Sequence, residues 1–156
     1  MTAKLNAALA ECRPHAATLA GAMREAELLR PVTAERAQSL DDPTRRLLDQ
    51  LAYRFTKLQD SLGEKVLPGL LERAEEPLAP DALFGEKLQR LERLGAIPSA
   101  DAWRVLREVR NAIAHEYPDQ PAIQAAMIER LLDATDELLR VWTDVEAFAN
   151  RLGASP

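Results

Sequence analysis

Apolar residues recur three or four positions apart along most of this chain, and that spacing restricts it to helices that share a core. The clearest run is Leu47, Leu51, Phe55, Leu58 and Leu62, which fall on one helix face. Ala, Leu, Arg and Glu dominate while β-branched residues are scarce, which also favours helix. We therefore expect an all-α fold, with residues 1–156 forming one domain built as a bundle of four long helices and one or two short ones.

Capping and breaking residues predict the boundaries in the first half of the chain. A first helix should cover about residues 2–29, and Pro14 should kink it or split it in two. A short helical turn should begin after Thr33. Asp41 should cap a long second helix, which could bend at Pro68-Gly69 and end near residue 76.

The second half of the chain carries similar signals. A linker that ends in its own cap, Asp81, should precede a third helix over about 82–94, which Gly95 should end. Ser99 should cap the fourth helix. The fifth should cover about 121–152 and end at Gly153.

Composition excludes several classes of protein. The net charge is −5, which argues against broad, non-specific binding to nucleic acid. Cys12 is the one cysteine, so neither a disulfide framework nor a zinc cluster is expected. No segment approaches the ~18 apolar residues of a membrane span, and the N-terminus lacks the apolar core of a signal peptide. We expect a cytoplasmic protein without a membrane partner, a cofactor or a metal.

The candidate site is the run Arg110-Asn111-Ala112-Ile113-Ala114-His115-Glu116-Tyr117, which closes the fourth predicted helix and is followed by Pro118. Proline disfavours helix at the residue before it, so the helix should end at or before Tyr117. On a straight helix Arg110 and His115 would lie about 140° apart, too far to grip one phosphate. They converge only if the last turn unwinds, or if a second subunit supplies the missing group. This geometry motivates the prediction of a homodimer.

The residue types in this run suit phosphodiester chemistry. Arginine binds phosphate through paired hydrogen bonds, and histidine transfers protons near neutral pH. We find no nucleophilic Ser or Cys with a nearby base in the sequence, and RNA carries its own nucleophile, the 2′-hydroxyl. We therefore expect metal-independent RNA cleavage with His115 as general base or acid and Arg110 stabilising the charged transition state. Because one imidazole cannot easily be both base and acid, a twofold dimer would supply two copies of each residue.

The run also resembles a family motif, Arg, four residues, His, one residue, Tyr, found in HEPN-domain toxins of the HepT type. The stretch Tyr53-Arg54-Phe55-Thr56-Lys57-Leu58-Gln59-Asp60 is similar to related chains as well, and length and helix order match over nearly the whole chain. The resemblance implies a HEPN-type helical bundle, a homodimer, and endoribonuclease activity without a metal. It makes Arg110 and His115 catalytic and Asn111 a supporting residue.

The same resemblance implies a partner. HepT-like toxins are paired with an antitoxin, often a minimal nucleotidyltransferase that transfers AMP to the motif tyrosine, which here is Tyr117. An AMP group at that position would add bulk and negative charge beside the cleft and repel RNA phosphate. The chain would then be the toxin of a type VII-like toxin-antitoxin system.

Other interpretations remain open. Arg110 could bridge to a carboxylate on the second helix, with His115 capping its own helix end. Arg54, Lys57 and Asp60 could face the run across a groove or form a solvated face with charge pairs. The chain could be a non-catalytic helical module that binds a nucleotidyltransferase or a nucleotide, or a purely structural dimer or adaptor.

Overall fold

The computed structural model describes residues 2–74, 78–79, 81–115 and 119–154, and within these ranges every regular element is a helix. A 3-10 turn (η1, Glu27–Leu29) follows the first α-helix, and a π turn (η2, Leu62–Val66) joins two others. The α-helices are α1 (Ala3–Ala26), α2 (Ala34–Gln38), α3 (Asp42–Ser61), α4 (Leu67–Arg73), α5 (Phe84–Leu94), α6 (Ala100–Ala112) and α7 (Pro121–Ala154). The prediction of an all-α bundle is confirmed.

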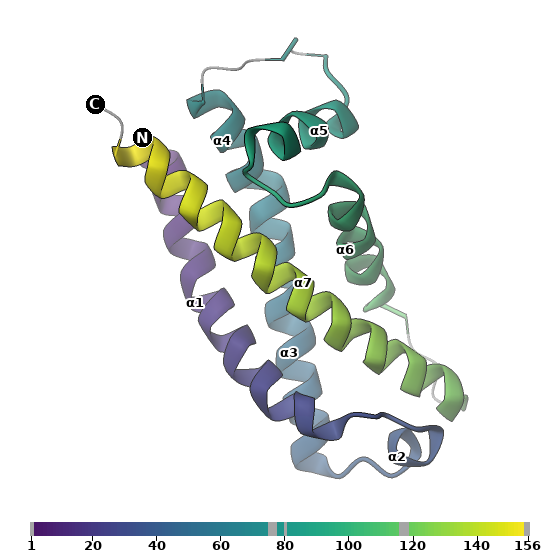
Figure 1. Ribbon diagram of the computed structural model, residues 1–156. Coiled ribbons are helices and arrows are strands. Elements are labelled where there is room, and N and C mark those ends of the chain that lie inside the picture. The colour runs from purple at the N-terminus through teal and green to yellow at the C-terminus, as the bar shows by residue number, and fades with distance from the viewer. Residues whose placement is uncertain (1, 75–77, 80, 116–118, 155–156) are drawn as a thin grey trace.

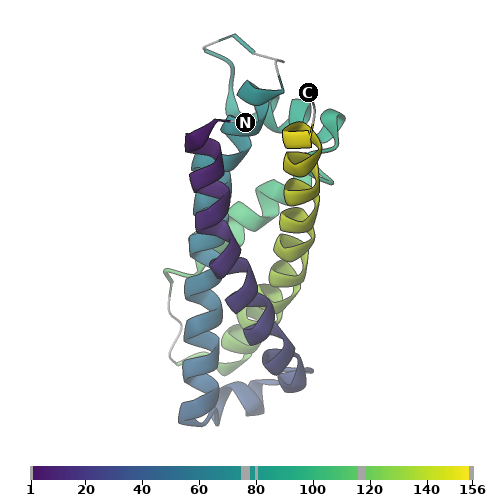
Figure 2. The same ribbon diagram turned by 90° about the vertical axis from the view of Figure 1, so that its left-hand side faces the viewer.

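Three long helices, α1, α3 and α7, form the body of the bundle. Figure 2 shows them side by side, with the two ends of the chain close together at one end of the bundle. Figure 1 shows α5 and α6 on one side of α3, and α2 across the end of the bundle opposite the termini. Helix α6 packs on both α3 and α7, so its C-terminal end, where the candidate run begins, is held against two long helices.

The apolar stripe of α3 forms the centre of the core. Leu51, Phe55, Leu58 and Leu62 are completely buried, and Leu47 is half-buried against the same cluster. Each fully buried Leu or Phe side chain contributes about 1.5–3 kcal/mol to the free energy of folding. The predicted face is therefore the buried one.

Three predicted helix boundaries are confirmed in atomic detail. The Asp41 carboxylate accepts a hydrogen bond from the Thr44 amide at 2.9 Å, and the Ser99 hydroxyl accepts one from the Ala102 amide at 3.1 Å. Gly95 ends α5 with φ at 82°, a left-handed conformation that a side chain would disfavour.

Two other boundary predictions are wrong, and a third is wrong in part. Pro14 was expected to kink the first helix or split it; it lies inside α1 without splitting it, because the carbonyl it leaves unbonded, on Ala10, belongs to an exposed residue that water can reach. Helix α5 begins at Phe84 rather than after Asp81, since the residue before it, Leu83, is extended (ψ 151°). Helix α7 continues past Gly153, because one glycine costs a helix only about 1 kcal/mol. The expected end of the second long helix near residue 76 lies outside the described residues.

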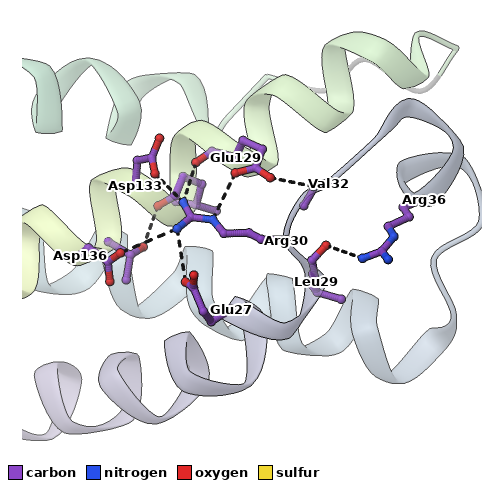
Figure 3. A network of polar contacts seen from close by, with 10 residues as sticks. Glu27, Leu29, Arg30, Val32, Arg36, Glu129, Asp133 and Asp136 are labelled. Atoms are coloured by element: carbon purple, nitrogen blue, oxygen red, sulfur yellow. Dashed lines mark hydrogen bonds and ion pairs between the residues drawn. The ribbon is translucent and has the colours of Figure 1, made fainter.

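A single guanidinium fastens the loop after α1 to α7 (Figure 3). Arg30 donates from Nε to Glu129 at 3.1 Å, from Nη1 to Glu27 at 3.2 Å, and from Nη2 to Asp133. Glu129 also accepts the Val32 amide at 2.7 Å. The Arg30 side chain is only 20% exposed, so these charge-assisted hydrogen bonds are partly shielded from water.

We expect Arg30→Met to lower the free energy of unfolding by about 1–3 kcal/mol, because it leaves the carboxylates of Glu129 and Asp133 without their shared cation. Urea denaturation would measure the change. Arg24→Met, at an exposed position in the last turn of α1, is the matched control and should change stability by less than about 0.5 kcal/mol. Equal effects of the two substitutions would contradict this role of Arg30.

Candidate functional site

Helix α6 carries the start of the candidate run and ends inside it. Its inner face is fixed by the buried side chains of Trp103, Leu106 and Val109. The helix ends at Ala112, and the His115 amide then bonds back to the Ala112 carbonyl at 3.0 Å in a tight turn. The last turn is thus unwound, and His115 stands outside the helix. This agrees with an end at or before Tyr117.

Arg110 forms a two-pronged ion pair with Asp60 of α3. Its Nε lies 2.8 Å from Asp60 Oδ1 and its Nη2 lies 2.9 Å from Oδ2. The side chains are 32% and 25% exposed, so the pair is half-buried between the two helices. The hydrogen bond from Arg110 is the main cause that lowers the pKa of Asp60. The structure therefore bears out the alternative in which Arg110 bridges to a carboxylate on the second long helix.

Arg107, one turn before Arg110, lies against the same part of α3. Its Nη1 is 3.6 Å from Asp60 Oδ1 and donates a hydrogen bond to Gln59 Oε1 at 3.4 Å. Two guanidiniums of α6 therefore share one carboxylate. The positive charge around Asp60 exceeds its negative charge, which favours the approach of an anion.

The surroundings of His115 are different from those of Arg110. His115 is exposed, and its ring has no hydrogen-bond partner among the described residues. It lines a cavity of about 200 Å³ together with Asp49 and Ala52 of α3 and Met127 of α7. It also borders a larger cavity of about 770 Å³ that extends toward Arg45. An imidazole in this position is open to solvent and to a ligand.

The α3 residues that lie near Arg110 and near His115 show how the two groups are spaced. Arg110 reaches toward Asp60, near the C-terminal end of α3, whereas His115 lies beside Asp49 in the N-terminal half. At ~1.5 Å per residue these two positions are about 16 Å apart along the axis. Within one subunit, the guanidinium and the imidazole therefore meet α3 at different positions.

The other residues predicted for the site are Asn111, Tyr117 and three residues of α3. Asn111 is exposed on the last turn of α6. Tyr117 lies outside the described residues. Of the three α3 residues that could face the run, Asp60 does so through Arg110, while Arg54 turns to the other side of the helix.

Sequence reasoning missed a second polar group, on the α1 side of α3. Arg54 Nη1 lies 3.0 Å from His15 Nδ1. Burial, and then the charge of Arg54, lower the pKa of His15. The exposed ring of Tyr53 has Arg54 Cζ and Lys57 Nζ each 5.6 Å from its centroid. In the sequence His15 is marked only by its place beside Pro14, and its pairing with Arg54 depends on how α1 packs on α3.

A comparison with protein-family models, with curated proteins and with solved structures finds no match to this chain. Among the described residues, no helix combines the length and apolar character that crossing a membrane requires.

We expect Asp60→Asn to lower the free energy of unfolding by about 1–2 kcal/mol at pH 7, because it removes the charge that both Arg107 and Arg110 face. The folded-state pKa of Asp60 is lowered, so the stabilisation is present above about pH 4 and disappears as the pH falls through that lower value. Urea denaturation of both proteins at pH 7 and pH 3 would test this.

The exposed Glu72 of α4 provides the control, and Glu72→Gln should leave stability nearly unchanged at both pH values. A difference between wild type and Asp60→Asn that persists undiminished at pH 3 would contradict the assignment of this pH dependence to Asp60.

Proposed function

We propose that this chain is a metal-independent endoribonuclease and the toxin component of a type VII-like toxin-antitoxin system. The observation that carries the proposal is the exposed imidazole of His115, just past the end of α6, on the same short segment as a guanidinium that Asp60 holds in place. A fixed cation stabilises the negative charge that develops on the phosphate in the transition state, and a free imidazole transfers the proton. The RNA 2′-hydroxyl is the nucleophile.

Two subunits are required for this chemistry. Arg110 of one chain is bound to Asp60, whereas His115 lines a cavity with Asp49, and Asp49 and Asp60 are about 16 Å apart along α3. A twofold axis beside α6 can place the guanidinium of one subunit near the imidazole of the other. The proposed active unit is therefore a homodimer, in which each cleft also gains a second imidazole for the acid step.

The proposed regulation rests on the resemblance to HepT-like toxins. A cognate minimal nucleotidyltransferase antitoxin would transfer AMP to Tyr117, two residues after His115. The added negative charge would repel the RNA backbone from the cleft. This neutralises the toxin without unfolding it.

One observation favours the alternative, a non-catalytic helical module that binds a nucleotidyltransferase or a nucleotide. Nε and Nη2 of Arg110 already donate hydrogen bonds to the carboxylate of Asp60. A guanidinium in such a pair can be structural, and it then contributes to the contact between α3 and α6 rather than to catalysis. The two functions differ in whether activity depends on the imidazole of His115.

We expect His115→Ala to reduce RNA cleavage by about 10²–10⁴-fold while the fold is retained, because it removes the group that transfers the proton. The measurement is cleavage of a labelled RNA by purified dimer, with and without a chelator, alongside circular dichroism.

The other histidine of the chain, His15, provides a matched control. His15→Gln keeps an acceptor for Arg54 on α1 and should leave cleavage within about twofold of wild type. Wild-type dimer that cleaves no RNA, whether or not a chelator is present, would refute the nuclease. Co-purification with a nucleotidyltransferase but no cleavage or growth arrest would support the alternative module.

A further inference from the structure

A separate cavity lies where α3, η2, α5 and α6 meet, on the Asp60 side of α6. Its volume is about 370 Å³, within the usual range of small-ligand sites. The walls are made by Gln59, Gly63, Phe84, Leu88, Trp103 and Arg107. None of these residues belongs to the run from Arg110 to Tyr117, so the cavity has no role in the chemistry described above.

Gln59 is the anomaly in this cavity. The residue is completely buried, and its Oε1 accepts the hydrogen bond from Arg107. Its Nε2 is also buried and has no hydrogen-bond partner among the described residues. Exchanging the amide atoms would not help, because an arginine can only donate and needs the oxygen on its side. An amide donor without an acceptor is unfavourable in a protein interior, and it becomes favourable when a ligand brings an acceptor.

The apolar walls suit a flat ring. Trp103 and Leu88 are each 1% exposed, whereas Phe84 is 45% exposed and offers most of the aromatic surface that a ligand can reach. Gly63 belongs to the π turn, and a Cβ at this position would lie 3.1 Å from Trp103 Cζ2. The glycine therefore allows the indole to pack directly against the backbone beside the cavity. Aromatic side chains of this kind stack on nucleobases.

The rim of the cavity carries more positive than negative charge. Arg104 and Arg107 contribute guanidiniums, and Glu64 contributes one carboxylate. Arg104 pairs with the exposed Asp101, and Arg107 shares Asp60 with Arg110, but the two side chains are 46% and 51% exposed and can still meet a ligand. The cavity begins at the first residues of α5, where Leu83 provides no side-chain cap for the helix amides. A ligand with a negative group on this side would be stabilised.

We propose that this cavity binds one nucleobase of an RNA strand, with the attached phosphate at the Arg104 and Arg107 rim. The base would stack on Phe84 and, once the side chains that cover Gln59 move aside, offer an acceptor to its Nε2. The inference rests on the proposed ribonuclease and deepens it, since Arg107 shares Asp60 with Arg110. A base held here therefore places the neighbouring phosphate of the strand at Arg110, and the cavity selects which base precedes or follows the cleaved bond.

Binding can be tested without any cleavage. The probes are AMP, CMP, GMP and UMP, and 2′-O-methyl trinucleotides with each base at the centre, which lack the nucleophilic hydroxyl. Calorimetry on the wild-type protein should detect binding of at least one base, with the trinucleotide binding at least as tightly as the mononucleotide. Gln59→Leu and Phe84→Ala should each weaken that affinity by tenfold or more.

Two controls separate a binding role from a structural one. Arg140→Gln removes an exposed guanidinium of α7, on a different surface, and should leave nucleotide affinity unchanged. Gln59→Leu should unfold at the same or a higher denaturant concentration than wild type, because it removes an unpartnered donor. A purely structural glutamine would instead make the variant less stable.

Three results would overturn the proposal. The first is no binding of any mononucleotide or trinucleotide at millimolar concentration, and the second is equal affinity for wild type and Gln59→Leu. The third is a mononucleotide whose binding is abolished by extension on either side, which would assign the cavity to a free nucleotide. Failure of the ribonuclease is distinguishable: the pocket then binds nucleotides with the expected effect of Gln59→Leu, while no RNA is cut.

Discussion

The ion pair between Asp60 and Arg110 joins the middle of the bundle to the end of α6, and the candidate site is arranged around it. In the sequence of α3, Asp60 comes directly after buried residues. The packing that places Phe55 and Leu58 in the core therefore also sets the position of Asp60. Arg110 follows directly after buried Val109 on α6. The pair thus links two helices whose inner faces are fixed, and it determines where the α6 cation is held.

This arrangement places three groups that the proposed function uses at different positions along α3. His115, released from α6 by the unwound turn, lies open to solvent beside Asp49. Arg110 sits farther along α3, bound to Asp60. Beyond it, Arg107 leads to the cavity containing Gln59. Under the proposed function, an RNA strand that follows α3 would meet His115, then Arg110 and then this cavity, with the first two groups completed across a dimer axis.

Local sequence signals predicted much of this fold. The stripe on α3 and the caps at Asp41, Ser99 and Gly95 depend on residues within one turn of each other, so spacing alone reveals them. The sequence also left open that Arg110 bridges to a carboxylate on the second long helix. It could not indicate which one, because Asp60 is selected by the register in which α6 packs on α3.

Other features depend on tertiary structure and left no local signal. The contact of Arg54 with His15 requires α1 and α3 to lie side by side. Nε2 of Gln59 can be recognised as unpartnered only once the structure shows that Arg107 is hydrogen-bonded to the amide oxygen. The most direct test of this account is a double-mutant cycle on the free energy of unfolding at pH 7, using Asp60→Asn, Arg110→Gln and the double variant. A coupling energy of about 1–2 kcal/mol is the predicted result, and additive effects to within about 0.3 kcal/mol would contradict it.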